Sequence, residues 1–323
     1  AGRINDSIDP AFVIWGRSAV PGLAALARQK GIPVYRMEDG FVRSVGLGAD
    51  KILPYSFCLD SRGIYFDATT PSDLEVLLAN YQFDDAEVEA ARAAIDLLLH
   101  EGVSKYNFPN ESRGHDVYGE KVTKRVLVIG QVEDDASIKY GAPAGVTNND
   151  LVRLARAENP DAQVIYKIHP DVLAGRRAYN SDPGEVADIC EIRSESLSLH
   201  EAFTGVDQVY TFTSLAGFEA LLRGIPVTTV GAPFYAGWGL TDTRMETPRR
   251  GRALSLEQLF YGVYVLYAKY MDPNTGAPIT LMDAIAAIVD QRGSINPMIE
   301  SQEEADLEQM VSPAESAREV LIS

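Results

Sequence analysis

The chain has 323 residues, enough for two domains of ordinary size, and 46% of them are hydrophobic and 23% charged, as in water-soluble globular proteins. Its net charge of −17 argues against a nucleic-acid-binding protein, which needs a basic face. No apolar run approaches the length of a membrane span and no signal peptide is recognisable, so we expect a cytoplasmic protein.

The first half of the chain alternates short apolar strands with helices. We expect strands at residues 11–15, 33–37, 56–59 and 64–66, the last two paired around a turn at 61–63. Helices are expected at residues 21–29 and 85–100, and a further helix is expected to begin after Ser72, its N-cap. Residues 105–119 are rich in Asn, Pro, Ser and Gly, so they predict a connection between an N-terminal domain (1–120) and a C-terminal domain (121–323).

The second half repeats the alternation, with strands expected at residues 125–129, around Val164, around Val209 and at 227–230. Helices are expected at residues 149–157, 183–190, 215–223, 254–270 and 281–291. Residues 300–308 predict an acidic tail, and 313–321 a helix that crosses back to the first domain. The predicted fold class is α/β, with two Rossmann-like domains and a cleft between them.

Polar residues follow two of the predicted buried strands. Lys167 and His169 come at the end of one, and Thr213 and Ser214 at the end of the next. In open α/β sheets ligands bind at this carboxyl edge, and hydroxyls with a helix N-terminus suit a phosphate. Glu219, one turn further on, could hold ribose hydroxyls. The alternatives are a structural loop histidine, an ordinary helix cap and an internal partner for Glu219.

Two acidic loops follow predicted strands, one after the strand at 33–37 and one after the first strand of the second half. Residues 131–137 hold three consecutive acids, Glu133, Asp134 and Asp135, and residues 38–40 hold Glu38 and Asp39. Facing each other across a cleft, they would supply a nucleophile and an acid/base pair. Solvated acidic turns are the alternative. Neither loop has the histidines of a zinc site, and Cys58 and Cys190 are expected to be reduced core residues.

Two further segments have open interpretations. Residues 233–241 form a glycine-interrupted aromatic loop around Trp238, which fits either core packing or stacking on a sugar or base. Arg244, Arg249, Arg250 and Arg252 form a local basic cluster, which fits either a solvated loop or contact with an anionic acceptor or membrane surface.

Together these motifs resemble the KpsC-type capsule polysaccharide β-Kdo glycosyltransferases. The matching segments occur in family order at residues 38–44, 63–67, 131–137, 167–171, 213–224 and 234–241. Members of that family often carry two such modules in tandem, whereas this chain holds one. Its residues 131–137 look more like the C-terminal module than the N-terminal one.

The resemblance implies a GT-B fold and CMP-β-Kdo as donor. It also implies transfer, with retention of the β configuration, to a Kdo-terminated acceptor on a phosphatidylglycerol lipid. No metal or other cofactor is required, because protein donors can replace a metal at a single phosphate. The implied partners are this donor and acceptor, a second transferase module and capsule-assembly proteins, without nucleic acid. The implied location is cytoplasmic, with peripheral contact at the inner face of the inner membrane.

The resemblance also implies roles for individual residues. Asp135 falls on the family's fixed acid and is the expected nucleophile, Glu38 or Asp39 the base for the acceptor, and His169 a donor to the leaving phosphate. Arg43 or Lys167 is expected to neutralise the Kdo carboxylate. The other expected substrate-binding residues are Gln131, Pro170, Thr213, Ser214, Gly217, Glu219 and Trp238.

Three alternatives stay open at the level of sequence. Retention can proceed through two inversions or through front-face departure of the leaving group. A nucleotide-sugar epimerase can share the fold, since fold does not fix function. A non-catalytic module that binds the acceptor or an assembly partner is the third, and in it the acidic loops would be dispensable. The linkage formed, to the 4 or the 7 hydroxyl of Kdo, does not follow from the motifs.

Overall fold

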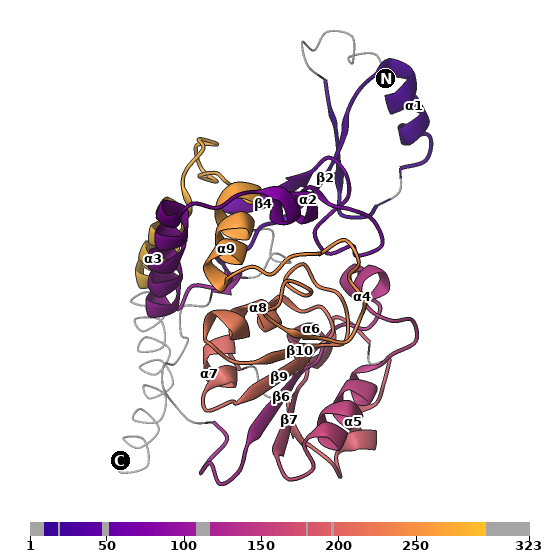
Figure 1. Ribbon diagram of the computed structural model, residues 1–323, viewed down its shortest axis with the longest axis vertical. Coiled ribbons are helices and arrows are strands. Elements are labelled where there is room, and N and C mark those ends of the chain that lie inside the picture. Colours follow the sequence, from indigo (N-terminus) through magenta and orange to yellow (C-terminus); the bar gives the residue numbers. More distant parts are fainter. Residues whose placement is uncertain are drawn as a thin grey trace, which may run out of the picture.

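A computed structural model describes residues 10–18, 20–46, 52–107, 117–178, 180–194 and 197–294. The predicted acidic tail at 300–308 and the predicted helix at 313–321 lie outside these residues. Figure 1 shows a lower sheet with its helices and an upper, smaller sheet that contains β2 and β4, with α1 at its far end.

The first half contains the short elements that precede residue 108. They are β1 (Phe12–Trp15), α1 (Leu23–Lys30), β2 (Val34–Asp39), β3 (Ser44–Val45), β4 (Ser56–Asp60), α2 (Asp73–Asn80), α3 (Asp85–Glu101) and β5 (Tyr106–Asn107). Ser72 caps α2 as predicted, and Asp84 and Glu87 form a capping box that starts α3. The predicted strand at 64–66 is wrong, because these residues form a turn.

The second half contains a longer alternation of strands and helices. Its elements are β6 (Arg125–Ile129), α4 (Ala136–Gly141), α5 (Asn148–Glu158), β7 (Gln163–Lys167), α6 (Pro170–Leu173), η3 (Pro183–Val186), β8 (Glu191–Arg193), α7 (Leu199–Phe203), β9 (Gln208–Thr211), α8 (Leu215–Leu222), β10 (Val227–Thr229), β11 (Asp242–Thr243), α9 (Leu256–Phe260), η4 (Tyr261–Tyr267) and β12 (Lys269–Tyr270). Residues 281–294 form a final helix.

The second half folds around a six-stranded sheet of order β11-β10-β9-β6-β7-β8 in which every pair is parallel. All five residues of β6 are buried, as expected for a strand covered on both faces. The parallel prediction is confirmed for this half. Because the strands run the same way, the residues that follow β6, β7 and β9 meet at one edge of the sheet.

The first half differs from the predicted Rossmann-like arrangement. Its sheet has the order β1-β2-β4-β12, and only β1 and β2 are parallel, because β4 pairs antiparallel with both β2 and β12. Strand β12 comes from the far end of the chain, and α9 packs against α3. Residues after about 254 therefore return to the first half, as Figure 1 shows for α9 beside α3.

The predicted long helix at 254–270 is interrupted. Ser255 caps α9, which ends at Phe260, and the backbone continues as the π-helical segment Tyr261–Tyr267 before β12 begins. Phe260 and Tyr264 are both buried and stack with ring centroids 4.5 Å apart, so this part of the segment packs into the core.

A buried ion cluster joins the two halves. Glu75 on α2 accepts hydrogen bonds from Arg249 and, at 3.0 Å, from Arg250 in the loop after β11. Arg250 also donates to the carbonyls of Pro233 and Ala236, so it fixes the aromatic loop. In the basic cluster at 244–252, Arg250 is thus buried, whereas Arg249 pairs with Glu75 and keeps an exposed side. Arg244, at its other end, pairs with Glu158 and Asp242.

We predict that Glu75→Ala lowers the free energy of unfolding by about 3–5 kcal/mol, because it leaves the buried Arg250 guanidinium without its carboxylate. Urea denaturation measures this directly. The matched control is Glu89→Ala, which removes an exposed pair with Arg92 and should cost less than about 1 kcal/mol. Equal effects of the two substitutions would show that the cluster does not hold the halves together.

Candidate functional site

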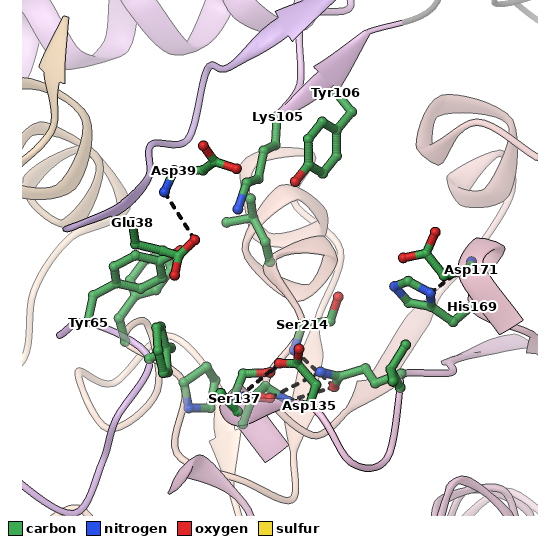
Figure 2. A pocket seen from close by; sticks show the side chains of 18 of the residues that line it. Glu38, Asp39, Tyr65, Lys105, Tyr106, Asp135, Ser137, His169, Asp171 and Ser214 are labelled. Carbon is green, nitrogen blue, oxygen red and sulfur yellow. Dashed lines mark hydrogen bonds between the residues drawn. The ribbon is translucent and has the colours of Figure 1, made fainter. Parts of the chain in front are cut away.

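Two adjoining cavities lie where the two halves meet. The first, of about 390 Å³, is lined from both halves, and the second, of about 690 Å³, extends from it along the ends of β6 and β7 toward α7 and α8. Six residues line both: Lys105, Tyr106, His169, Asp171, Ser214 and Leu215. In Figure 2 Glu38, Asp39 and Lys105 come from the first half and lie across the cavity from Asp135, Ser214 and His169. We call the two spaces the inner cavity (390 Å³) and the long cavity (690 Å³).

Asp135 presents one carboxylate oxygen to the inner cavity. Its Oδ1 accepts hydrogen bonds from the backbone N–H of Ser137 at 2.9 Å and from the Ser137 hydroxyl at 2.8 Å, because Asp135 is the N-cap of α4. Its Oδ2 forms no hydrogen bond with any described residue. The carboxylate is thus held at one oxygen and open at the other, as a nucleophile or charge stabiliser requires.

The other two acids of this loop have structural partners. Glu133 accepts hydrogen bonds from the backbone N–H of Asn148 and the hydroxyl of Ser181, and Asp134 pairs with Arg177 at 2.6 Å. Of the three consecutive acids, only Asp135 lines the inner cavity.

Gln131 links the two strand ends that were predicted separately. Its side-chain oxygen accepts from the backbone N–H groups of Thr213 (2.8 Å) and Ser214 (3.0 Å), and its amide nitrogen donates to the Thr213 hydroxyl. These two N–H groups are therefore not free for a phosphate, contrary to the sequence-based expectation. The Ser214 Oγ accepts from Ala216 N at the start of α8, which leaves the Ser214 hydroxyl proton for a ligand.

His169 is oriented as a neutral donor. Its Nδ1 accepts the backbone N–H of Asp171 at 3.1 Å, so the neutral ring carries its proton on Nε2. Burial lowers the pKa of His169 below its usual 6.5, a shift that the charge of Asp171 opposes. Pro170 follows at the first helical position of α6 and lines the long cavity. The ring thus offers an N–H to an anion at neutral pH.

Two lysines supply positive charge to the cavities. Lys167, at the end of β7, lines the long cavity and is 5% exposed, and burial lowers the pKa of its ammonium below 10.5. Lys105, from the first half, lines both cavities. Neither forms an ion pair with a described residue. The buried Lys167 ammonium without a carboxylate is costly unless an anionic ligand joins it, so Lys167 points to an anionic ligand.

Glu38 and Asp39 at the end of β2 are not equivalent. Asp39 is paired with the buried Arg43 at 2.8 Å, which neutralises it. Glu38 has no ion pair with a described residue, and burial raises the pKa of its carboxyl above 4.5, opposed by the charge of Lys105. Glu38 is therefore the better proton acceptor of the two.

The structure places three of the predicted substrate-binding residues away from both cavities. Arg43 is buried against Asp39 and Ser44. Trp238 is fully buried, and its Nε1 donates to the Phe234 carbonyl at 2.8 Å. Gly217 lies under the Tyr235 ring, where an added Cβ would meet the hydroxyl at 2.2 Å. These residues shape the core and do not line a cavity.

Thr213 lines the inner cavity and Glu219 the long one. Glu219 is 1% exposed and lies 3.7 Å from Arg223, the kind of internal partner that the sequence left open as an alternative to ribose. Sequence reasoning missed Lys105, Tyr106, Tyr65 and Phe66. Lys105 and Tyr106 open the Asn- and Gly-rich stretch that was interpreted as a connection, and only the pairing of β5 with β3 brings them to the cavity. Among the described residues no cluster of three or more His, Cys, Asp or Glu side chains has the arrangement of a metal site.

Comparisons with known proteins agree on one family. The family described as "Capsule polysaccharide biosynthesis protein" matches residues 10–270. The chain is 46% identical over 291 residues to the lipopolysaccharide-processing protein LpsZ of Rhizobium meliloti, covering 88% of this chain and 65% of that protein. It is 41% identical to the capsule polysaccharide modification protein LipA of Neisseria meningitidis, covering 90% of this chain and 41% of LipA. The chain thus spans less than two thirds of these relatives.

Two solved structures from Thermosulfurimonas dismutans are similar over most of their length. The KpsC β-Kdo 2,4 transferase matches with a TM-score of 0.75 and 33% identity, covering 86% of each chain. The KpsC β-Kdo 2,7 transferase matches with a TM-score of 0.70 and 37% identity, covering 89% of this chain and 87% of that one. No helix in the described part of the chain is long and apolar enough to cross a membrane.

We predict that Gln131→Glu weakens the binding of inorganic phosphate by at least about tenfold, because it adds a negative charge among Thr213, Ser214 and the anion donors. The new carboxylate still accepts the two N–H groups, so the protein should stay folded, with a loss of about 1–3 kcal/mol in the free energy of unfolding because a charge is buried. Phosphate titration and urea denaturation measure the two effects. Gln131→Met is the control, and it should lose about 1–3 kcal/mol of stability because both N–H groups lose their acceptor. If Gln131→Glu leaves the phosphate affinity unchanged, phosphate does not bind beside Gln131.

Proposed function

We propose that this chain, which belongs to the capsule polysaccharide biosynthesis family and is of the KpsC type, is a retaining β-Kdo transferase that uses CMP-β-Kdo. The observation that carries the proposal is the inner cavity itself. Asp135, with one oxygen that accepts no hydrogen bond from a described residue, lies across from the proton acceptor Glu38, and Lys105 and the neutral donor His169 line the same cavity. Lys167 lines the adjoining long cavity.

The charges of the cavities suit this donor. CMP-β-Kdo carries one phosphate and one carboxylate, and the two lysines provide one cation for each. Lys167 and the Nε2–H of His169 lie along the long cavity, where the phosphate of CMP would bind with its ribose toward Glu219. Lys105 lies between the acidic loops and would hold the Kdo carboxylate, in the role that the sequence suggested for Arg43.

In the first step Asp135 Oδ2 forms a bond to the anomeric carbon of Kdo. The bond from that carbon to the phosphate oxygen breaks, and its electron pair leaves with CMP. The N–H of His169 and the hydroxyl of Ser214 stabilise the charge that grows on the phosphate. Ser137 holds Oδ1 in place, so the attacking oxygen keeps one orientation.

In the second step an acceptor hydroxyl attacks the same carbon and Asp135 leaves as a carboxylate. Glu38 takes the hydroxyl proton, which its raised pKa favours. Two inversions restore the β configuration. Asp39, paired with Arg43, keeps the loop of Glu38 in place.

The same proposal extends to the fold, the acceptor and the location of the chain. The fold is GT-B-like, with donor residues from the second half and Glu38 from the first. The acceptor is a Kdo-terminated, lipid-linked oligosaccharide, and the chain works in the cytoplasm beside a second transferase module. The two similar Kdo transferases form different linkages, so nuclear magnetic resonance of the product determines which hydroxyl is used here.

We predict that mixing the protein with CMP-β-Kdo produces a Kdo-sized mass increase in intact mass spectrometry, and that Asp135→Ala abolishes it. Asp134→Ala is the matched control, because Asp134 is the adjacent acid but pairs with Arg177 outside the proposed reaction. This control should retain the adduct.

Other outcomes separate the alternatives. CMP release with a Kdo acceptor but no adduct would contradict the covalent step and favour front-face departure. If the protein neither releases nor binds CMP, the transferase proposal is contradicted. Binding of UDP-sugars would then indicate an epimerase, and no such binding an acceptor-binding module.

We predict that transfer to the acceptor falls as pH drops through the pKa of Glu38, which burial places above the usual 4.5. The base works only when deprotonated, so a raised pKa moves the acidic limb of the rate profile to higher pH. Glu38→Gln should lower the transfer rate by about 10²-fold or more and remove this limb, while adduct formation persists. If Glu38→Gln leaves the pH profile of the transfer rate unchanged, another residue is the base.

A further inference from the structure

The turn that follows β4 brings two aromatic side chains to the inner cavity. Tyr65 and Phe66 are half-buried and line this cavity but not the long one, and the same holds for Glu38. In Figure 2 Tyr65 lies on the same side of the cavity as Glu38, across from Asp135. The proposed chemical steps use Glu38 and Asp135 but neither aromatic side chain.

Tyr65 is held in one orientation. Its ring packs among Phe41, Phe66 and Phe234, with ring centroids 5.1, 5.7 and 5.8 Å away. Its hydroxyl forms no hydrogen bond with a described residue and remains accessible from the cavity that it lines. Burial raises the pKa of Tyr65 well above its usual 10, and the charge of Glu38 contributes, so the hydroxyl keeps its proton as a donor.

Phe66 places an apolar surface beside Glu38. Among the described aromatic residues its ring contacts only Tyr65, so it is less enclosed than the Tyr65 ring. An added Cβ at Gly16 would lie 4.0 Å from Phe66 Cζ and 3.2 Å from Glu38 Oε2, so the ring and the carboxylate both border this glycine. The proton acceptor thus has an apolar wall next to it.

Two buried aspartates fix the turn at its ends. Asp60 accepts the backbone N–H of Gly63 at 2.7 Å. Asp67 accepts the backbone N–H of Thr69 at 2.8 Å and pairs with Arg17 at 3.1 Å. Because each carboxylate fixes the backbone beside it, the two aromatic residues between them keep one position.

The turn is also bonded to the helix that Asp135 caps. The backbone N–H of Ala68 donates to the Tyr140 carbonyl at 3.0 Å, and the Arg17 guanidinium lies 4.7 Å from the centre of the Tyr140 ring. Tyr140 belongs to α4, whose N-cap is Asp135. The two aromatic side chains therefore keep a fixed place relative to the proposed nucleophile, as a group that positions a second substrate must.

We propose that Tyr65 and Phe66 form the subsite for the acceptor sugar. The C–H face of the sugar ring packs on Phe66, and the Tyr65 O–H donates to a sugar hydroxyl next to the one that Glu38 deprotonates. An apolar wall with a few fixed polar groups is the usual composition of a small-molecule site. The inference rests on the proposed function, because it adds the acceptor's binding residues to the base Glu38.

The test separates the two half-reactions. Formation of the adduct on Asp135 needs only CMP-β-Kdo, whereas transfer also needs an acceptor, here a soluble Kdo glycoside. Tyr65→Phe keeps the ring and removes only the hydroxyl, so it should form the adduct like the wild type and raise the acceptor KM by about fivefold or more. Phe66→Ala should raise the acceptor KM by about tenfold or more and also keep the adduct.

Matched controls remove the same atoms outside both cavities. Tyr261→Phe and Phe83→Ala act on two half-buried rings that pack against each other at 6.4 Å. Both controls should leave adduct formation and the acceptor KM unchanged. Urea denaturation of all four variants checks that each is folded.

Binding of the Kdo glycoside alone, measured by saturation-transfer nuclear magnetic resonance, gives a readout that needs no donor. We expect the wild type to bind the glycoside and Phe66→Ala to lose most of that binding. Three results would overturn the proposal: an unchanged acceptor KM in both variants, a loss of adduct formation in both folded variants, or glycoside binding that is absent from the wild type or equal in Phe66→Ala. Failure of the proposed function appears instead as a wild type without adduct and without CMP release, so the two failures are distinguishable.

Discussion

The contact between Glu75 and the two arginines Arg249 and Arg250 holds the arrangement on which the site depends. It ties α2 of the first half to the loop after β11, and Arg250 extends the connection to the carbonyls of Pro233 and Ala236. Pro233 and Phe234 form part of the inner cavity wall. A buried carboxylate that must satisfy two guanidinium groups allows few alternative positions, so the two halves keep one spacing across the cavity.

Within that spacing, the parallel sheet determines which groups can act together. The ends of β6, β7 and β9 meet at one edge, and Gln131 joins the first of them to the third by accepting the N–H groups of Thr213 and Ser214. Asp135 and His169 are each fixed at one atom by a neighbouring N–H, which leaves Asp135 Oδ2 and His169 Nε2 available in the cavity that both residues line. A preorganised catalytic side chain has one atom held by hydrogen bonds, so that its other polar atom keeps a fixed direction toward the reacting group.

Sequence patterns predicted the parts whose signals are local. The strand-end residues Asp135, Lys167, His169 and Ser214 follow runs of buried residues, so their shared edge could be inferred before the structure. Lys105 could not, because it reaches the cavity only through the pairing of β5 with β3. Nor could the pairing of β12 with β4, about two hundred residues earlier, or the ion pair that keeps Arg43 buried against Asp39. Contacts between residues far apart in the sequence produce no hydrophobic periodicity, so sequence patterns do not predict them.

Isothermal titration with CMP tests the central claim, that these cavities bind a CMP-sugar, most directly. The account predicts saturable binding of CMP to the wild type, weaker binding of UMP, and a loss of about tenfold or more in His169→Ala, because one hydrogen bond to a charged phosphate is removed. Absence of CMP binding, or equal affinity in His169→Ala, would contradict it.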